Sequence, residues 1–285
     1  MRIAERFATG RPVYSFEFFP PRTEAGFDAL FQTIRDLKPL DPDFVSVTWG
    51  AGGSTRRKTV ELVIEIQRDV GLTAMAHLSC IGSTPEQLAA TLDTLASGGI
   101  ENVLALGGDR PRDYAPPPGA FTFANELAAF LRGRWRFCLG AACYPETHPL
   151  AESPEADLRH LVHKVDAGVD FLITQLFFDN ADYFAFVARA RAAGILVPIV
   201  PGIMPIVSVA GIRRMTSMSG ARIPEELAAS LAAAEHDDDL TREVGVEWAA
   251  RQCRELVLRG APGIHFYTLN RSTATRAILQ QLRQG

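Results

Sequence analysis

Eight short apolar runs alternate with longer amphipathic segments along almost the whole chain, and this alternation limits the fold more than any other feature. Short apolar runs are typical of buried strands, and amphipathic segments between them are typical of helices that cover a parallel sheet. The predicted strands are 13–18, 43–48, 73–79, 102–106, 136–143, 170–176, 196–200 and 263–269.

Helix starts are signalled between these runs. Thr84-Pro85-Glu86-Gln87 supplies a capping threonine, a proline at the first helical position and the glutamine of a capping box. Ser153-Pro154 repeats the first two signals. The acidic run 235–239 is predicted to be an exposed turn. Predicted helices include 61–70, 86–96 and 156–167, and two more, 223–234 and 241–258, between the last two strands.

Strand–helix units repeated in this way through 285 residues predict an α/β fold, a (β/α)8 barrel with extra helices between its seventh and eighth strands. No sequence repeat and no serine- or glycine-rich linker divides the chain. We therefore expect residues 1–285 to form a single barrel domain. A doubly wound parallel sheet is the alternative architecture.

The uncharged segment 192–212 has the length of a membrane span. Pro198, Pro201 and Pro205 would break a helix there, because proline lacks the backbone N–H that a helix needs. The segment therefore predicts a buried strand followed by an irregular loop, and no association with a membrane.

Composition narrows the classes of partner. The 29 basic and 33 acidic residues give a formal net charge of −4, which argues against nucleic acid or an anionic membrane as a partner. The charged N-terminus lacks an apolar core, so we expect no secretory signal and a cytoplasmic protein. The oligomeric state stays open, a homo-oligomer included.

No metal-binding or paired spacing connects the four cysteines, Cys80, Cys138, Cys143 and Cys253, so we expect buried thiols and no metal site.

The stretch SFEFFPPR places one carboxylate, Glu17, among phenylalanines. Because side chains alternate along a strand, Val13, Ser15 and Glu17 share one face and the phenylalanines at 16 and 18 share the other. Catalytic residues of such barrels lie at the carboxyl ends of the strands, so Glu17 is placed in the mouth. The alternative is a glutamate at an exposed strand end. The same alternation predicts inward side chains on other strands, at Ser46, Thr48, His77, Ser79, Val103, Ala105, Ile173 and Gln175. Just beyond the ends of strands it leads to three further polar residues, Asp109, Tyr144 and Arg271.

Two glycine-rich stretches follow predicted strands. GAGGST, residues 50–55, lacks the third glycine of a dinucleotide fingerprint, so it predicts a flexible loop that can approach a ligand rather than a Rossmann motif. GGDRP, residues 107–111, puts backbone without side chains beside Asp109. It is either a ligand-approaching loop or a tight turn with a capping aspartate.

Asp157, His160, His163 and Lys164 lie at helical spacing, on one face or on neighbouring faces of the helix predicted at 156–167. Three interpretations stay open. The face is solvated, or the two histidines bind a metal that has no further obvious ligand, or the helix lines an anionic ligand such as a pyrophosphate.

Several stretches, in order along nearly the whole chain, resemble methylenetetrahydrofolate reductase in its short bacterial form. The resemblance implies a barrel that holds FAD at its mouth. In this family NADH or NADPH reduces the flavin, which then reduces 5,10-methylenetetrahydrofolate to 5-methyltetrahydrofolate. It also implies a place in one-carbon metabolism and methionine biosynthesis, without the regulatory domain of eukaryotic members. The stretches are SFEFFPPR, VSVTWGA, AHLSCIGST, NVLALGGDRP, AACYPETHP, KVDAGVDFLITQLFFD, PGIMPI and HFYTLNR.

Carried over by motif, Glu17 matches the family's acid, and Asp109 matches a residue near both the flavin and the folate. The folate-contacting positions are Gln175, Arg271, Met215 and Asp109. The cofactor-binding positions are Thr48, Trp49, Ala51, His77, Gly107, Gly108, Asp109, Phe123, Ala124, Tyr144, His148, Ala151, Asp157, His160 and Lys164.

Four positions, three of them among these matches, depart from the family's pattern. Many members have arginine at Gly107 and a tyrosine at Trp49, and some have glutamine at Gly211 and phenylalanine at Met215. The departures concern one flavin contact, the nicotinamide side of the site and the packing over the folate.

The implied reaction needs an acid, because protonating the bridging nitrogen opens the five-membered folate ring. Apolar surroundings and a neighbouring Asp109 would raise the pKa of Glu17 and let it keep a proton near neutral pH. Three alternatives stay open: a pterin-binding methyltransferase barrel that uses a corrinoid or a metal, a folate- or flavin-binding subunit without catalysis, and a different flavin barrel, such as one that oxidises proline.

Overall fold

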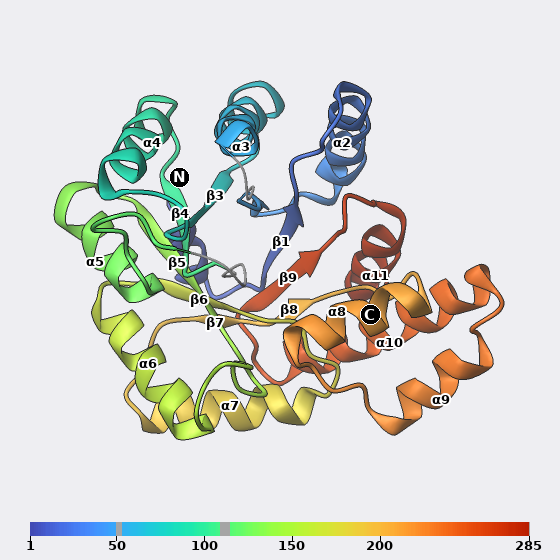
Figure 1. Ribbon diagram of the computed structural model, residues 1–285. Helices are drawn as coiled ribbons and strands as arrows, with labels where there is room; N and C mark the ends of the chain where they lie inside the picture. Colours follow the sequence, from blue (N-terminus) through green and yellow to red (C-terminus); the bar gives the residue numbers. More distant parts are fainter. Residues whose placement is uncertain (50–52, 109–114, 285) are drawn as a thin grey trace.

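The computed structural model describes residues 1–49, 53–108 and 115–284, with backbone alone at 53–55 and 284. Within this part, one parallel sheet runs in the order β7-β6-β5-β4-β3-β2-β1-β9-β8 and curls into a nearly closed barrel ringed by helices (Figure 1), which confirms the predicted fold class. The strands are β1 (Val13–Phe18), β2 (Phe44–Val47), β3 (Ala74–Ser79), β4 (Asn102–Leu106), β5 (Cys138–Cys143), β6 (Phe171–Thr174), β7 (Ile199–Val200), β8 (Gly202–Ile203) and β9 (Gly263–Tyr267).

Helices follow most strands and cover the outside of the sheet. The capping box predicted at Thr84 is present, and Ser153 accepts a hydrogen bond from the N–H of Ala156. The helices are α1 (Ile3–Phe7), α2 (Glu24–Leu37), α3 (Gly53–Glu65) with a π-helical turn (Ile66–Val70), α4 (Pro85–Ser97), α5 (Ala124–Arg134), α6 (Pro154–Asp166), α7 (Asn180–Ala192), α8 (Val209–Ser219), α9 (Glu225–Ala233), α10 (Asp238–Leu258) and α11 (Thr273–Gln284).

The predicted seventh strand, 196–200, is shortened to β7, and a second short strand that was not predicted, β8, follows it after Pro201. Before the proline, β7 pairs with β6, and after it β8 pairs with β9, so the two short strands bridge the ends of the sheet. Proline cannot donate to a ladder, but the carbonyl of Pro201 still accepts a hydrogen bond from the N–H of His265 at 2.9 Å. The eighth predicted strand is therefore β9.

Segment 192–212 differs from the prediction at its end. The buried strand is present, but Ser208 caps a helix, α8, that begins at Val209, where we predicted irregular loop. Within the described residues, no helix combines the length and the apolar character that crossing a membrane requires. The acidic run was predicted as a turn, yet α10 already begins at Asp238 because Asp237 caps its first N–H groups.

Register shows which side chains enter the barrel. Glu17 pairs with Ser46, and His77 pairs with Leu104, and paired residues of neighbouring strands share a face. The predicted inward positions on β1, β2, β3 and β6 agree with this register. The prediction for β4 was wrong by one residue: Val103 and Ala105 pack under the helices in the main outer core, and Leu104 points inward.

The amino-terminal end of the barrel is closed by an apolar floor. Helix α1 inserts Ile3 beneath the strands, where the inward residues Phe44, Met75 and Phe171 are fully buried. Asn102 holds the helix in place, because its side-chain oxygen accepts the N–H of Ile3 at 2.8 Å. The opposite, carboxyl end is therefore the open one.

Candidate active site

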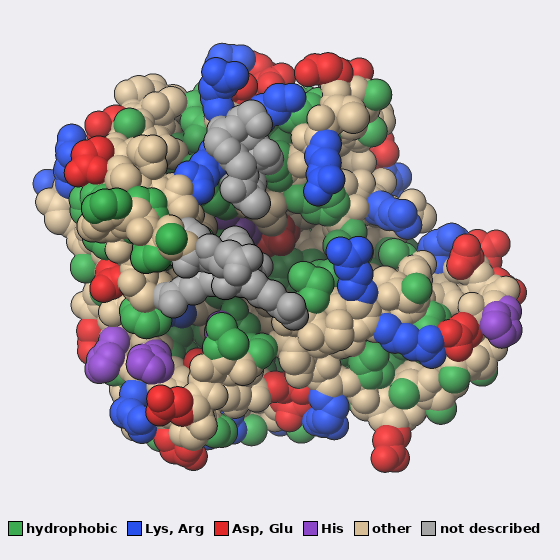
Figure 2. Space-filling model, viewed as in Figure 1, with side chains coloured by type: hydrophobic (Ala, Val, Ile, Leu, Met, Phe, Trp, Pro, Cys, Tyr) green, Lys and Arg blue, Asp and Glu red, His purple; other side chains and the backbone are tan. Residues whose placement is uncertain are grey.

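Glu17 lies at the carboxyl end of β1 and faces two imidazoles inside the barrel. Its Oε2 atom is 3.3 Å from Nε2 of His265 and 3.4 Å from Nε2 of His77. The glutamate side chain keeps 17% exposure, whereas the two histidines keep 0% and 5%. Figure 2 shows this face of the molecule with a hollow near its centre, in which acidic and histidine side chains are visible.

The pKa of Glu17 is lowered, which corrects the expectation from sequence. Burial raises the pKa, but the lowering effects of two histidines together exceed it. The largest is the charge interaction with His77, and the next are the hydrogen bond and the charge interaction with His265. The expected apolar surroundings are absent because Phe16 and Phe18 point into the outer core and Phe19 is 43% exposed. Glu17 is therefore a carboxylate at neutral pH. Burial also lowers the pKa of His77, to about 4, so this imidazole is neutral.

The chain beyond β9 fixes the end of β1. Thr268 donates its hydroxyl to the carbonyl of Glu17 at 2.6 Å. Asn270 accepts the N–H of Phe19 at 3.0 Å and donates to the carbonyl of the same residue at 2.8 Å. Asn270 adopts a left-handed backbone with φ 56°, which asparagine tolerates better than most residues. The two motifs at the ends of the chain thus build one rim of the mouth.

A tight glycine turn follows β4. Gly108 has φ 90°, and a Cβ at this position would approach the Ser79 hydroxyl to 2.1 Å, so a side chain is excluded there. Ser79 donates that hydroxyl to the carbonyl of Gly107 at 3.1 Å. At Gly107 itself a Cβ would meet nothing closer than 3.9 Å. The turn therefore leads into Asp109, which lies outside the described residues, as does Ala51.

A second cluster lies beyond β5 and contains several predicted cofactor positions. The rings of Tyr144 and His148 pack edge to face at 4.5 Å. Asp157, at the start of α6, accepts the N–H of His148 at 2.9 Å, and the carbonyl of His148 accepts the N–H of Ala151 at 2.9 Å. This loop is thereby compact, and Thr147 within it has a φ of 96°.

Lys164 lies beneath that loop. Its Nζ donates to the carbonyl of Ala142 on β5 at 2.7 Å, and burial lowers its pKa. A small cavity between β5, α6 and α7 is lined by Tyr144, Asp157, His160 and Lys164, so four predicted residues meet there. His163, on the same helix, is exposed.

The remaining predicted cofactor positions lie around the other strand ends. Thr48 and Trp49 follow β2, and the indole N–H of Trp49 is buried without a hydrogen-bond partner among the described residues. Phe123, 58% exposed, and Ala124, which is buried, stand at the start of α5.

The predicted folate positions lie on the opposite side. Gln175 follows β6, and its side-chain oxygen accepts the N–H of Leu176 at 2.9 Å. Met215 on α8 packs against an apolar cluster that Tyr267 also contacts. Arg271 and Gly211 are exposed.

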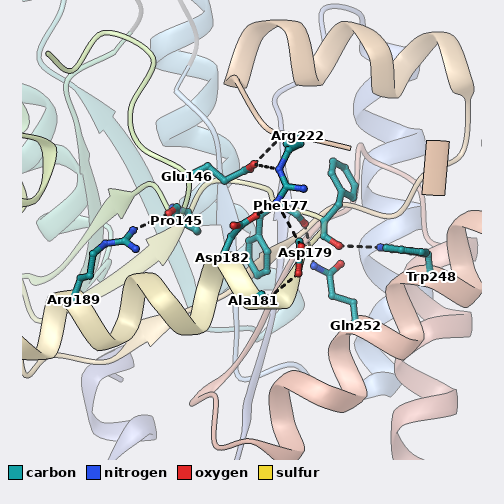
Figure 3. Close-up of polar contacts among 11 residues, drawn as sticks. Pro145, Glu146, Phe177, Asp179, Ala181, Asp182, Arg189, Arg222, Trp248 and Gln252 are labelled. Atoms are coloured by element: carbon teal, nitrogen blue, oxygen red, sulfur yellow. Dashed lines mark hydrogen bonds and ion pairs between the residues drawn. The ribbon is translucent and has the colours of Figure 1, made fainter. Parts of the chain in front are cut away.

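Three side chains anchor the loop after β6, which carries Gln175 into the mouth (Figure 3). From α10, Gln252 donates to the carbonyl of Phe177 at 3.0 Å, and the indole N–H of Trp248 donates to the next carbonyl at 3.2 Å. Arg222, between α8 and α9, donates to Asp182 at 2.9 Å and contacts Asp179 at 3.5 Å. The inserted helices therefore brace this loop.

Sequence reasoning left three interior residues out of the site, although it had placed Ser15 on the face of Glu17. Ser15 lies within hydrogen-bond distance of Nδ1 of His265, at 2.8 Å, and Tyr267 donates its hydroxyl to the carbonyl of Thr174 at 2.6 Å. Burial, and then the charges of Glu17, Cys143 and Tyr144, raise the pKa of Tyr267. The alternation on β9, applied as it was on β1, points His265 and Tyr267 inward, and that signal could have found them.

Comparison with known proteins places the chain among folate enzymes. Residues 2–283 match the family model described as methylenetetrahydrofolate reductase. The chain is 39% identical over 295 residues to a probable methylenetetrahydrofolate reductase (NADH) from Oryza sativa, with 99% of this chain and 50% of the relative covered. It is 38% identical over 268 residues to the Escherichia coli 5,10-methylenetetrahydrofolate reductase, with 94% and 90% covered.

The chain spans about half the length of the first plant and yeast relatives it matches. Among solved structures, an uncharacterized protein from Clostridium thermocellum that binds two copies of 5-methyl-5,6,7,8-tetrahydrofolic acid superposes with a TM-score of 0.67 at 14% identity, with 98% of this chain and 97% of that chain covered. A dihydropteroate synthase from Vibrio fischeri superposes with a TM-score of 0.53 at 12% identity, with 96% and 94% covered. These two likenesses concern the fold.

Proposed function

The chain belongs to the methylenetetrahydrofolate reductase family, and on this premise we propose that it reduces 5,10-methylenetetrahydrofolate to 5-methyltetrahydrofolate. The observation that carries the proposal is the carboxylate of Glu17, held between His77 and His265 at the centre of the barrel mouth. NADH or NADPH is the proposed electron donor, and the names of the plant relatives, which specify NADH, support this class of donor.

The residues present fit FAD as the cofactor. Lys164 offers a largely buried cation, and Tyr144 and His148 offer flat rings beside it, as an anionic dinucleotide requires. The buried indole N–H of Trp49 lacks a partner among the described residues and could donate to a ligand acceptor. When bound, FAD would carry the hydride between the nicotinamide and the folate.

Glu17 is the proposed general acid. A carboxylate with a lowered pKa holds no proton at neutral pH, so Glu17 must take one up before it can act. A ligand that covers the mouth excludes water, and this desolvation raises a carboxyl pKa. Glu17 then donates the proton to the bridging nitrogen of the folate, and its hydrogen bond to His265 keeps it in place.

Asp109, Gln175, Arg271 and Met215 are the proposed folate contacts. The bracing of the loop after β6 supports Gln175 in this role, because an anchored loop presents its first residue in one position. Small-molecule folate and nicotinamide are thus the proposed partners.

The full chain, purified with FAD added, tests the proposal in two steps. Flavin absorbance after gel filtration tests cofactor binding. Anaerobic addition of NADH or NADPH should bleach the flavin, and 5,10-methylenetetrahydrofolate should then restore its absorbance with 5-methyltetrahydrofolate as the product. A chain that binds no FAD, or a reduced flavin that the folate leaves unchanged, would contradict the proposal.

A further inference from the structure

Directly below Glu17, two fully buried polar residues face each other across β1 and β9. The hydroxyl of Ser15 lies 2.8 Å from Nδ1 of His265, and neither residue has any exposed surface. The other ring nitrogen, Nε2, faces Glu17 at 3.3 Å. The three side chains therefore form one hydrogen-bonded line from the barrel interior to the mouth.

The ring of His265 is fixed in this orientation by its neighbours. Phe44 stacks against it with 6.0 Å between centroids and 17° between planes, and Tyr267 packs edge on at 5.4 Å. Rotation of the ring would break both contacts as well as the hydrogen bond to Ser15. What remains variable is which of the two nitrogens carries the proton.

Only one tautomer satisfies all three side chains. A serine hydroxyl can donate or accept, but Nδ1 is the one hydrogen-bond partner of the buried Ser15 hydroxyl among the described residues, so its hydrogen is satisfied when it donates to Nδ1. The proton of the ring then lies on Nε2 and is donated to the Glu17 carboxylate. The opposite tautomer would point a nitrogen lone pair at that carboxylate. The other described titratable groups near Glu17 are His77, whose neutral ring also places Nε2 at 3.4 Å from the same carboxylate oxygen, and Tyr267, which directs its hydroxyl to the carbonyl of Thr174.

We propose that Ser15 and His265 are positioning residues that set the pH at which Glu17 becomes protonated, with Ser15 selecting the Nε2–H tautomer of His265. The functional part of this inference rests on the proposed reductase activity. Loss of the Ser15 hydroxyl frees the opposite tautomer, which disfavours the carboxylate and favours its protonated form. The pKa of Glu17 then rises.

Ser15→Ala tests this inference, and Ser46→Ala is the matched control. Ser46 is the register partner of Glu17 on β2, and its buried hydroxyl has no hydrogen-bond partner among the described residues. The rate of flavin reoxidation by 5,10-methylenetetrahydrofolate should fall as pH rises through the pKa of Glu17. In Ser15→Ala the midpoint should move to higher pH by about half a unit to one unit, the equivalent of one hydrogen bond. Ser46→Ala should leave the midpoint in place.

The tautomer itself is measured by ¹⁵N NMR of the histidine-labelled holoprotein at pH 7, with His265 assigned by its absence in His265→Gln. Nε2–H in the parent and a population of Nδ1–H in Ser15→Ala would support the inference. Nδ1–H in the parent, or a Ser15→Ala spectrum and pH midpoint identical to the parent's, would overturn it. If the parent protein does not reduce the folate, the proposed function fails, and the spectra still decide whether Ser15 selects the tautomer.

Discussion

The two ends of the barrel interior are built by the same alternation of side chains, yet they have opposite chemistry. Along β1 the inward residues pass from Val13 at the floor, through Ser15, to Glu17 at the mouth. At the floor the neighbours are apolar, and Ile3 closes the end. At the mouth the neighbours of Glu17 are imidazoles, and Figure 2 shows a hollow on this face.

This difference separates stability from activity along one set of strands. Burying apolar side chains at the floor stabilises the fold, whereas a buried carboxylate beside two histidines adds little or costs stability. Residues that are costly to bury and are nevertheless held in position are characteristic of functional sites. Variants at the two ends should therefore alter different measurements, and four predictions test that separation.

The largest effect is expected for Glu17→Gln at the mouth. Glutamine keeps the size of the side chain but cannot act as an acid, so reoxidation of the flavin by the folate should slow by roughly 100- to 10,000-fold. Reduction of the flavin by the nicotinamide needs no ring opening and should stay within about tenfold of the parent, a bound of about 1.4 kcal/mol. Stopped-flow measurement of the two half-reactions separates them.

If both half-reactions of Glu17→Gln fall together, the side chain supports the structure of the mouth instead. If neither falls, the proton comes from another group. The urea midpoint of this variant should stay close to the parent's, because the mouth contributes little to stability.

The next largest effect is expected for Phe171→Ala at the floor. The phenylalanine is fully buried between Phe7 and Phe44, at centroid distances of 5.5 and 6.3 Å. Its removal leaves a cavity, and the free energy of unfolding should fall by about 3–5 kcal/mol in urea titrations. Leu258→Ala, at a residue 79% exposed, is the control and should change it by less than about 0.5 kcal/mol.

The folate half-reaction of the folded Phe171→Ala protein, measured well below its melting temperature, should match the parent's. A parallel loss of folate reduction and stability would show that the floor and the mouth are energetically coupled.

The third prediction concerns acid sensitivity at the mouth. Burial lowers the pKa of His77 from 6.5 to about 4, so the unfolded chain takes up this proton at a higher pH than the folded one. The stability associated with neutral His77 is therefore complete above pH 6.5 and is lost as the pH falls to about 4, by at most about 3 kcal/mol.

Urea titrations between pH 4 and 7 should show a smaller acid loss in His77→Gln than in the parent. His163→Gln, at an exposed histidine of α6, is the matched control and should behave as the parent does. Equal pH dependence in the parent and in His77→Gln would show that His77 accepts its proton without cost in the folded protein.

Alternation and capping signals predicted most of the fold because both are local. The period of β1 placed Glu17 in the mouth, and Thr84 marked the start of α4. The error on β4 arose because its inward face is fixed by the pairing of His77 with Leu104 on the neighbouring strand. The sequence of β4 alone does not reveal this pairing. Helix α8 was missed because the prolines before it dominate the segment.

The site was predicted less completely than the fold. The resemblance predicts Glu17 as its acid, and that role stays a prediction. The direction of the Glu17 pKa depends on His77 and then on His265, which lies 248 positions away in the chain. Tertiary neighbours of this kind outweigh the adjacent phenylalanines, which point to the opposite face of the strand. The roles of Asp109 and Ala51 stay predictions, since both lie outside the described residues.

The smallest effect is expected for Arg222→Ala, which tests how the mouth is braced from outside. The guanidinium of Arg222 forms ion pairs with Asp179 and Asp182 at the start of α7. The backbone N–H of Arg222 donates to the side chain of Glu146 at 2.9 Å. The Arg222 side chain is 57% exposed, so the stability loss should stay below about 1 kcal/mol. The loop after β6 should nevertheless open more often, since one of its anchors is removed.

Hydrogen exchange of the amides in 176–182 measures that opening, and Arg213→Ala is the matched control. Arg213 is equally exposed, at 57%, but pairs only with Glu235 among the described residues, away from this loop. Exchange in 176–182 should quicken by a few-fold in Arg222→Ala and stay unchanged in Arg213→Ala. Equal exchange in the two variants would mean that Trp248 and Gln252 hold the loop without Arg222, and that the bracing of Gln175 comes from α10 alone.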